Sequence, residues 1–270
     1  MNEPMAGILP VPLPTSERRA GAAARSAGRS TLWRAVPALL LLVALAGLLA
    51  APTAQAEDGY DLWLRYVPVE GERLPQYRGA ATQLVMGNAP SATQRAARAE
   101  LDRGLTGLLG DAPPRAQRVT RDGAIVLGTP ASSPVVASLH LDLRSLGPEG
   151  YVIRSVTVRG HRATLIAANR DIGVLYGTFA FLRLLQTRRP VDRLAIESAP
   201  RIERRVLDHW DNLDGSVERG YAGASLWKWQ LLPDELDPRY TDYARACASI
   251  GINGTVLTNV NASADVLAPL

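Results

Sequence analysis

The sequence RVLDHWDNLDG at residues 205–215 decides the fold, and SVERGYAG follows it at residues 216–223. Its first residues are apolar and suit a short strand, whereas its last residues combine aromatic, acidic and amide side chains with a glycine. This pattern indicates a strand whose carboxyl end opens into a binding site. A helix closed by Gly251 is expected at residues 240–250, and a second strand at residues 253–260. Strand, helix and strand in this order predict one βαβ unit of a parallel sheet.

Polar side chains follow both predicted strands. A right-handed crossover places the two strand ends side by side, on the face where a (β/α)₈ barrel binds substrate. The candidate site residues at these ends are Trp210, Asp211, Asn212, Asn259 and Asn261. The flat ring of the tryptophan suits the C–H face of a sugar, and the carboxylate and amide groups suit its hydroxyls. We therefore favour a carbohydrate site here.

The alternative is structural: Trp210 packs under a loop, and residues 214–215 only make a turn. Glycoside hydrolysis needs two carboxylates on opposite sides of the bond. The local carboxylates are Asp208, Asp211, Asp214 and Glu218. They lie too close together in the sequence to embrace a sugar, so we expect no catalytic pair among them.

Two neighbouring features have structural interpretations. Asp208 is interpreted as an inward ion-pair partner of Arg204 or Arg205. Trp227 and Trp229 are interpreted as a core or rim cluster rather than a sugar platform. Neither interpretation adds a reactive group to the site.

The residues before this stretch predict a small α/β layer domain at 57–198, followed by the first strands of a barrel at 199–270. Apolar runs predict strands at 81–86 and 124–128 and a pair of strands at 150–156 and 162–167 joined by a turn at 159–161. Helices are expected after Ser91, at 129–139, and after residues 169–171, which are expected to cap the last of them. The alternating residues 57–66 favour an opening strand or an extended arm. The polar segment at 188–200, framed by Pro190 and Pro200, indicates a linker.

The first 56 residues predict a leader. Five arginines precede an apolar run at residues 35–50, and Ala54-Gln55-Ala56 forms a small-x-small cleavage signal. A membrane anchor is the competing interpretation, but the run is short for a span and contains Pro37. We expect cleavage after Ala56, no stable membrane span afterwards, and a secreted or periplasmic protein.

Charge and cysteine content narrow the function classes. The leader holds five arginines and two glutamates, so its removal lowers the formal charge from +4 to about +1. No basic stripe remains to favour nucleic acid. Cys247 is the only cysteine, which excludes an intrachain disulfide, and His140, His161 and His209 lie far apart in the sequence. We therefore predict neither a metal site nor a cofactor.

Three runs resemble one family of enzymes: RVLDHWDNLDGSVERGYAG at residues 205–223, INGTVLTNVNA at 252–262 and EDGYDLWLRY at 57–66. They are similar to the α-glucuronidases of glycoside hydrolase family 67. The resemblance implies cleavage of the α-1,2 link between (4-O-methyl)glucuronic acid and the terminal xylose of xylo-oligosaccharides. It implies a sandwich-like α/β accessory domain of the β-hexosaminidase type, followed by a (β/α)₈ TIM barrel. It also implies that the full-length family can form homodimers.

The resemblance further implies an inverting mechanism whose acid and base come from later barrel strands, beyond Leu270. Trp210 matches the tryptophan of the family's sugar pocket, and Val260 falls where the pocket wall meets the uronic acid. We therefore expect this chain to be inactive alone. The alternatives are a noncatalytic exported carbohydrate-binding or scaffold protein, and another glycosidase such as a β-hexosaminidase, against which HWDNLDG argues.

Overall fold

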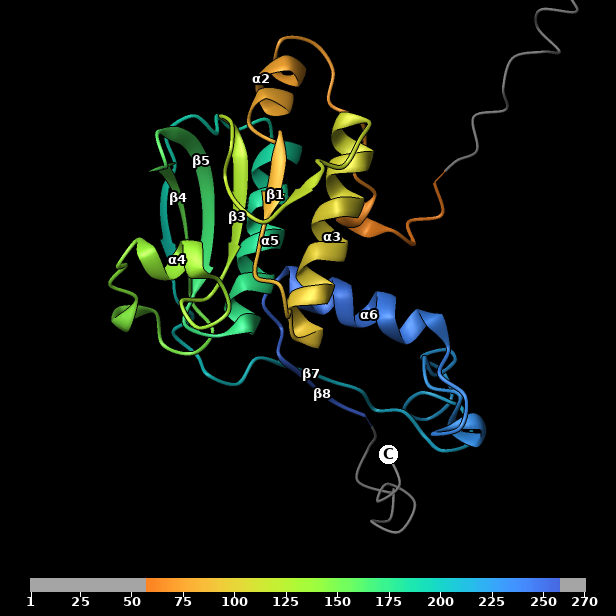
Figure 1. Ribbon diagram of the computed structural model, residues 1–270. Helices are drawn as coiled ribbons and strands as arrows, with labels where there is room; N and C mark the ends of the chain where they lie inside the picture. Colours follow the sequence, from red (N-terminus) through yellow and green to blue (C-terminus); the bar gives the residue numbers. More distant parts are fainter. Residues whose placement is uncertain (1–56, 258–270) are drawn as a thin grey trace, which may run out of the picture. The chain divides into compact units, whose positions relative to one another are not determined.

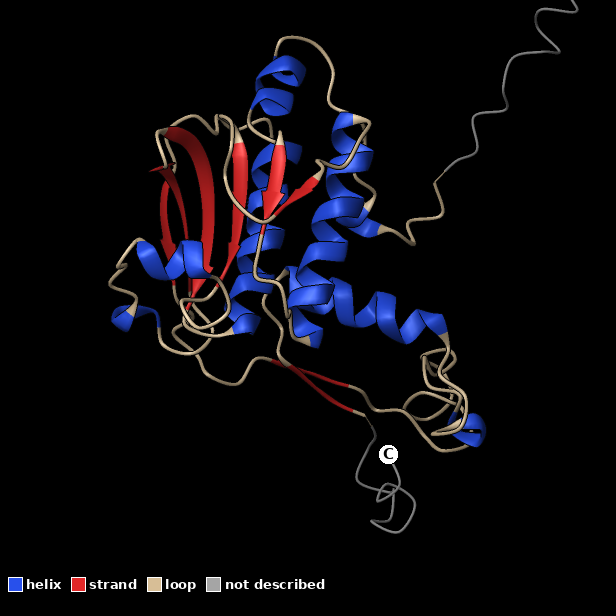
Figure 2. Cartoon of the chain, in the orientation of Figure 1, coloured by secondary structure: helices blue, strands red, loops and turns tan. Residues whose placement is uncertain are grey.

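The computed structural model describes residues 57–257. A six-stranded mixed sheet forms the centre of residues 57–198, called the N-terminal layer below (Figures 1 and 2). Its order is β2-β1-β3-β5-β4-β6. The strands are β1 Gln83–Val85, β2 Arg115–Ala116, β3 Ala124–Gly128, β4 Tyr151–Val158, β5 His161–Ala168 and β6 Ala195–Ser198. Neighbours from β2 to β5 run parallel, while β4 pairs antiparallel with both β5 and β6. The expected strands at 81–86 and 124–128 and the hairpin at 150–167 are confirmed.

Helices cover both faces of this sheet. The helices are α2 Arg73–Gly79, α3 Ala92–Leu109, α4 Pro134–Ser138, α5 Asp171–Gln186 and α6 Pro238–Ser249, with 3₁₀ turns η1 Leu62–Leu64, η2 Arg144–Leu146 and η3 Trp229–Leu231. Alternate residues of β3 face opposite sides: Ile125 and Leu127 pack with α3 and α5, and Val126 packs with Val136 of α4 (Figure 1). The sheet therefore has an apolar core on each face, as its continuous apolar strands require.

The long helix α3 shows why local sequence predicted so much of this layer. Ser91 accepts a hydrogen bond from the Gln94 backbone at 3.2 Å, and Gly110 ends the helix at φ +97°. Leu101 and Leu105 on its inner face are completely buried. Gly104 lets α5 approach, because a Cβ there would lie 2.6 Å from Leu182.

Residues 188–200 are not simply a linker, because they contain β6. Ile196 pairs with Ile153 of β4 and packs on the core shared by α3 and α5. Only one face of this edge strand is half-buried, so its polar residues hide the strand pattern from a sequence analysis. The domain boundary between residues 198 and 199 stays a prediction.

Residues 57–66 do not form a strand. Gly59, Leu62 and Tyr66 have φ values of +77°, +51° and +46°, which interrupt extended backbone, and η1 lies between them. Leu64 and Tyr66 are buried against the layer, whereas Leu62 is 49% exposed. Tertiary contacts of two side chains therefore override the alternation of the sequence.

Two helix starts also differ from expectation. Helix α4 begins at Pro134 rather than at residue 129, because Ser133 caps it and the proline fits the first helical position. Helix α5 begins at Asp171 without a side-chain cap. Asn169 instead donates to the carbonyls of Leu143 and Gly147 at 2.7 and 2.9 Å, so its side chain holds the loop at residues 143–147.

The expected βαβ unit is present in the second part of the chain. Strands β7 Val206–Asp208 and β8 Gly254–Val256 pair in parallel, and α6 connects them. The helix begins at the capping residue Asp237, and Gly251 follows its end at φ +79°. The described residues thus contain two separate sheets, the six-stranded mixed sheet and this two-stranded parallel sheet.

Helix α6 is fastened to the N-terminal layer through a buried carboxylate. Glu100 of α3 is 4% exposed and accepts from Arg245 of α6 at 2.7 and 2.9 Å, and from the Tyr66 hydroxyl at 2.6 Å. One turn further along, at the carboxyl end of α6, Ser249 accepts from Arg183 of α5 and from Trp63, both at 2.6 Å. The βαβ unit is therefore anchored on α3 and α5.

We predict that Glu100→Ala lowers the free energy of unfolding by about 1.5–3 kcal/mol, because the partly buried Arg245 loses its hydrogen bonds to Glu100 and keeps only its pair with Asp242. Urea denaturation of the variant and the parent measures this difference. The control is Arg193→Ala, which breaks the exposed Arg193–Asp192 pair and should change stability by less than about 1 kcal/mol. Equal effects of the two substitutions would contradict the anchoring role of Glu100.

Candidate functional site

A cleft of about 290 Å³ opens at the carboxyl end of β7. It is lined by Asp208, His209, Trp210, Asp211, Val217 and Glu218. This volume is at the lower end of the range for ligand pockets and suits a single sugar ring. The cleft lies in the stretch that the sequence singled out.

The loop after β7 is built from its own polar side chains. Asn212 donates through its side-chain amide to the Ser216 hydroxyl at 3.0 Å and to the Glu218 carbonyl at 2.7 Å. Asp214 accepts from the Ser216 backbone and hydroxyl at 2.9 and 2.6 Å, which lowers the pKa of its carboxyl group. Gly215 turns the chain at φ +86°. The expected turn at residues 214–215 is therefore present, and Asn212 contributes to holding it.

Trp210 faces the cleft and is not packed under the loop. Its side chain is 58% exposed, and its indole N–H donates to Asp208 at 3.3 Å. Its carbonyl accepts from the Glu218 backbone at 2.7 Å. The interpretation of Asp208 as an ion-pair partner of Arg204 or Arg205 is wrong, because Arg205 pairs with Glu149 and Asp208 points to the indole.

Asp211 has the opposite orientation to Trp210. It is 2% exposed, accepts a hydrogen bond from the Ser225 hydroxyl, and lies 3.7 Å from Nδ1 of His209. Its carboxylate therefore lies at the base of the cleft and organises the protein around it. Residues Trp210, Asp211 and Asn212 lie together, while Asn259, Val260 and Asn261 fall outside the described residues, so their place beside the cleft stays a prediction.

An aromatic cluster lies beneath the cleft, and sequence analysis missed its centre. The His209 ring contacts Trp227 and Tyr243 edge-on, at centroid distances of 5.6 and 5.4 Å, and its Nε2 lies 2.7 Å from the Tyr243 hydroxyl. Trp227 also packs on Tyr240, and Trp229 is 8% exposed. Trp229 is buried and Trp227 is half-buried, which agrees with the interpretation of the two tryptophans as core or rim residues. The helical spacing of the two tyrosines was the available signal for their shared face.

The acidic groups of the cleft do not form an opposed pair. Asp208 and Glu218 are both exposed and come from one strand end and its loop. Glu218 accepts from the hydroxyl of Tyr221, which raises the pKa of that tyrosine. Within residues 57–257 no three His, Cys, Asp or Glu side chains gather as a metal site. No helix in that range has the length and apolar character to cross a bilayer.

Two models of one family match almost the whole described chain. The model of the glycosyl hydrolase family 67 N-terminus matches residues 62–181, and that of the family 67 middle domain matches residues 184–270. The chain belongs to glycosyl hydrolase family 67. The resemblance of its three sequence runs to that family is confirmed.

Curated proteins similar to this family 67 chain are named as α-glucuronidases. A probable α-glucuronidase A of Neosartorya fischeri is 32% identical over 88% of this chain and 27% of the relative. A probable α-glucuronidase A of Aspergillus oryzae is 33% identical over 87% of this chain and 27% of the relative, and α-glucuronidase A of Aspergillus tubingensis is 33% identical over 79% and 25%. This chain thus spans about a quarter of the length of the curated relatives it matches.

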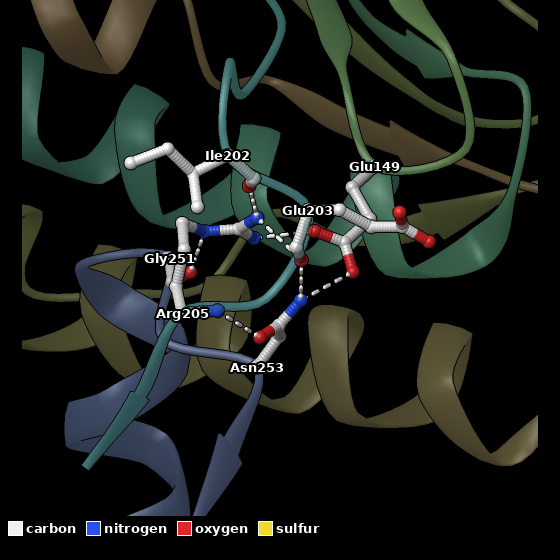
Figure 3. A network of polar contacts seen from close by, with 6 residues as sticks. All are labelled: Glu149, Ile202, Glu203, Arg205, Gly251 and Asn253. Atoms are coloured by element: carbon white, nitrogen blue, oxygen red, sulfur yellow. Dashed lines mark hydrogen bonds and ion pairs between the residues drawn. The ribbon is translucent and has the colours of Figure 1, made fainter.

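The family 67 chain also holds the amino ends of β7 and β8 with a polar network (Figure 3). Arg205 donates to the Gly251 carbonyl at 2.6 Å and pairs with Glu149, which comes from the loop before β4. Asn253 donates to Glu149 at 2.9 Å and accepts from the Arg205 backbone at 2.9 Å. This network joins the N-terminal layer to the βαβ unit at the end opposite to the cleft.

The network predicts a pH dependence of stability. Burial alone raises the pKa of Glu149, but hydrogen bonds from Asn253 and Arg205 outweigh it and hold the pKa below its usual value. A lowered folded-state pKa stabilises the fold above the unfolded-state pKa of about 4.3, and this stabilisation is lost as the pH falls through the folded-state pKa.

We expect Glu149→Gln to be less stable than the parent at pH 7, and the difference to shrink as the pH falls from about 5 towards 3. Urea denaturation at several pH values measures this. Replacement of the exposed Glu70 by Gln is the control and should give no such convergence. A difference that stays constant with pH would contradict the ion-pair assignment.

Proposed function

We propose that this chain forms part of an exported α-glucuronidase that removes (4-O-methyl)glucuronic acid from xylo-oligosaccharides with inversion. The match to both family 67 models, together with relatives named α-glucuronidase, carries this proposal. The leader-like residues 1–56 support export and cleavage after Ala56. Those residues lie outside the described part of the chain.

The cleft supports sugar binding by its shape and chemistry. Trp210 offers an exposed aromatic face, and a sugar ring presents C–H bonds that stack on such a face. Asp208 and Glu218 beside it are acceptors for sugar hydroxyls. We propose that this cleft forms one wall of the pocket for the uronic acid, with Asn259, Val260 and Asn261 on the adjoining wall.

We propose that β7 and β8 begin a (β/α)₈ barrel, preceded by an accessory domain of the β-hexosaminidase type. The exposed apolar side chains of the two-stranded sheet support the barrel, since Val206, Leu207 and Val256 are 50%, 38% and 44% exposed. In a closed barrel, neighbouring strands and helices cover such residues. The inverting acid and base, which must face each other across the bond, would come from later strands of that barrel.

A noncatalytic carbohydrate-binding protein is the second candidate. The exposed tryptophan and polar acceptors of the cleft would serve binding alone, whereas the relatives named α-glucuronidase favour the enzyme. Sugar affinity without turnover in the complete protein would support this candidate over the enzyme.

We predict that Trp210→Ala weakens binding of a glucuronic-acid-substituted xylo-oligosaccharide to residues 57–270 by about tenfold, because stacking on the indole is lost. The free energy of unfolding should change by less than about 0.5 kcal/mol, since the side chain is largely exposed. Isothermal titration calorimetry measures the affinity. Leu236→Ala, which removes a side chain that is 74% exposed outside the cleft, should bind normally. Equal affinities in all three proteins would argue against the cleft as the sugar site.

We also predict that residues 57–270 alone release no methylglucuronic acid from aldouronic oligosaccharides, because the proposed acid and base are supplied elsewhere in the barrel. Chromatography of the products with a complete family 67 α-glucuronidase as the positive control tests this. Clear turnover by residues 57–270 would show that the division between binding wall and catalytic groups is wrong.

A further inference from the structure

His209 is held from two sides although it lies next to an exposed residue. Its Nε2 lies 2.7 Å from the Tyr243 hydroxyl of α6, and its Nδ1 lies 3.7 Å from the Asp211 carboxylate. The same tyrosine hydroxyl lies 2.9 Å from the hydroxyl of Thr255 in β8. A chain of polar contacts thus runs from β8 through α6 to the end of β7.

One set of proton positions satisfies all the polar contacts of His209 and Tyr243. Burial raises the pKa of Tyr243, so its hydroxyl stays protonated near neutral pH. The tautomer with the proton on Nδ1 of His209 suits both neighbours, because Nδ1–H then faces the Asp211 carboxylate and Nε2 accepts from Tyr243. Nε2 of His209 is therefore held by a hydrogen bond within the protein, and Nδ1 faces a carboxylate 3.7 Å away.

The geometry of an extended chain connects His209 to the cleft. Successive side chains of extended backbone point to opposite sides, so an inward His209 directs Trp210 outward. The His209 amide donates to Val256 at 2.9 Å, and the Trp210 carbonyl accepts from Glu218 at 2.7 Å. The backbone is thus fixed on both sides of Trp210, while its indole makes a single exposed hydrogen bond, to Asp208. Rotation of this segment about its axis is opposed by the anchored imidazole together with these backbone hydrogen bonds and the buried Asp211.

We infer that His209 is a positioning residue of the sugar site: held between Asp211 and Tyr243, it sets the direction in which Trp210 faces the cleft. The inference rests on the proposed function, because it assigns a role to the sugar-stacking wall. It also changes the role of Asp211, whose buried carboxylate supports His209 and the Ser225 hydroxyl instead of reaching for the sugar.

The same residues do not form a nucleophilic triad. Ser225 donates to Asp211 and accepts from the Trp227 backbone at 3.0 Å. A reactive serine must give its proton to the histidine, with the aspartate on the far side of the imidazole. Here Asp211 stands between the serine and His209, so the cluster serves to hold the ring.

Fluorine NMR of the chain labelled with 5-fluorotryptophan tests the inference without any sugar. Trp210→Phe assigns the Trp210 resonance. We expect His209→Leu and Tyr243→Phe to shift and broaden this resonance, and His209→Gln, whose amide oxygen can accept from Tyr243, to restore much of the parent signal. Tyr240→Phe is the matched control, because its ring also packs on Trp227 but its hydroxyl accepts from the Lys228 backbone.

Calorimetry with the substituted xylo-oligosaccharide forms the second arm. His209→Leu and Tyr243→Phe should each lose about fivefold in affinity, comparable with the loss of one hydrogen bond, and Tyr240→Phe should match the parent. An unchanged Trp210 resonance in folded Tyr243→Phe and His209→Leu overturns the inference. Unchanged sugar binding in Trp210→Ala overturns the proposed function instead, and the fluorine signal separates the two failures.

Discussion

The buried carboxylate of Glu100 is the constraint on which the rest of the structure depends. A carboxylate that is 4% exposed has to be paired, and here it takes two hydrogen bonds from Arg245 and one from Tyr66. Because α3 is fixed to the sheet by its leucines, this group fixes α6 and the opening segment to the same frame. The Glu100 contacts raise the pKa of Arg245, so its guanidinium stays protonated over the whole physiological range.

Helix α6 in turn contacts the segment that lines the cleft, through Tyr243 and His209. Its Arg245 points to the N-terminal layer, while Tyr243, two residues earlier, points to His209 and Thr255. One helix therefore transmits the position of the rigid sheet to the end of β7. At the amino end of the βαβ unit, Arg205 and Glu149 hold the strands in a separate network. The βαβ unit is thus linked to the N-terminal layer at two places, through Glu100 and through Glu149.

Much of the N-terminal layer could be predicted, because the residues that define its helices and strands lie within or next to those elements in the sequence. Ser91 and Gly110 mark the ends of α3, and the apolar run of β3 matches its predicted bounds. The sequence predictions were wrong where contacts between residues far apart in the chain determine the local structure. A polar edge strand such as β6 becomes a strand only by pairing with β4. The sequence favours Asp208 as a partner of Arg204 or Arg205, but Arg205 pairs with Glu149, 56 residues earlier in the sequence.

The sequence by itself determined the family, the βαβ order and the stretch that contains the cleft, because these depend on residue types and their spacing along the chain. Only the tertiary structure decided which side chains of that stretch face outward. Trp210 is exposed and Asp211 is buried, although both were expected to contact a sugar. The physical reason is that the orientation of His209 and Asp211 depends on contacts with Tyr243 and Ser225, which lie further along the chain and reach these residues only in the folded structure.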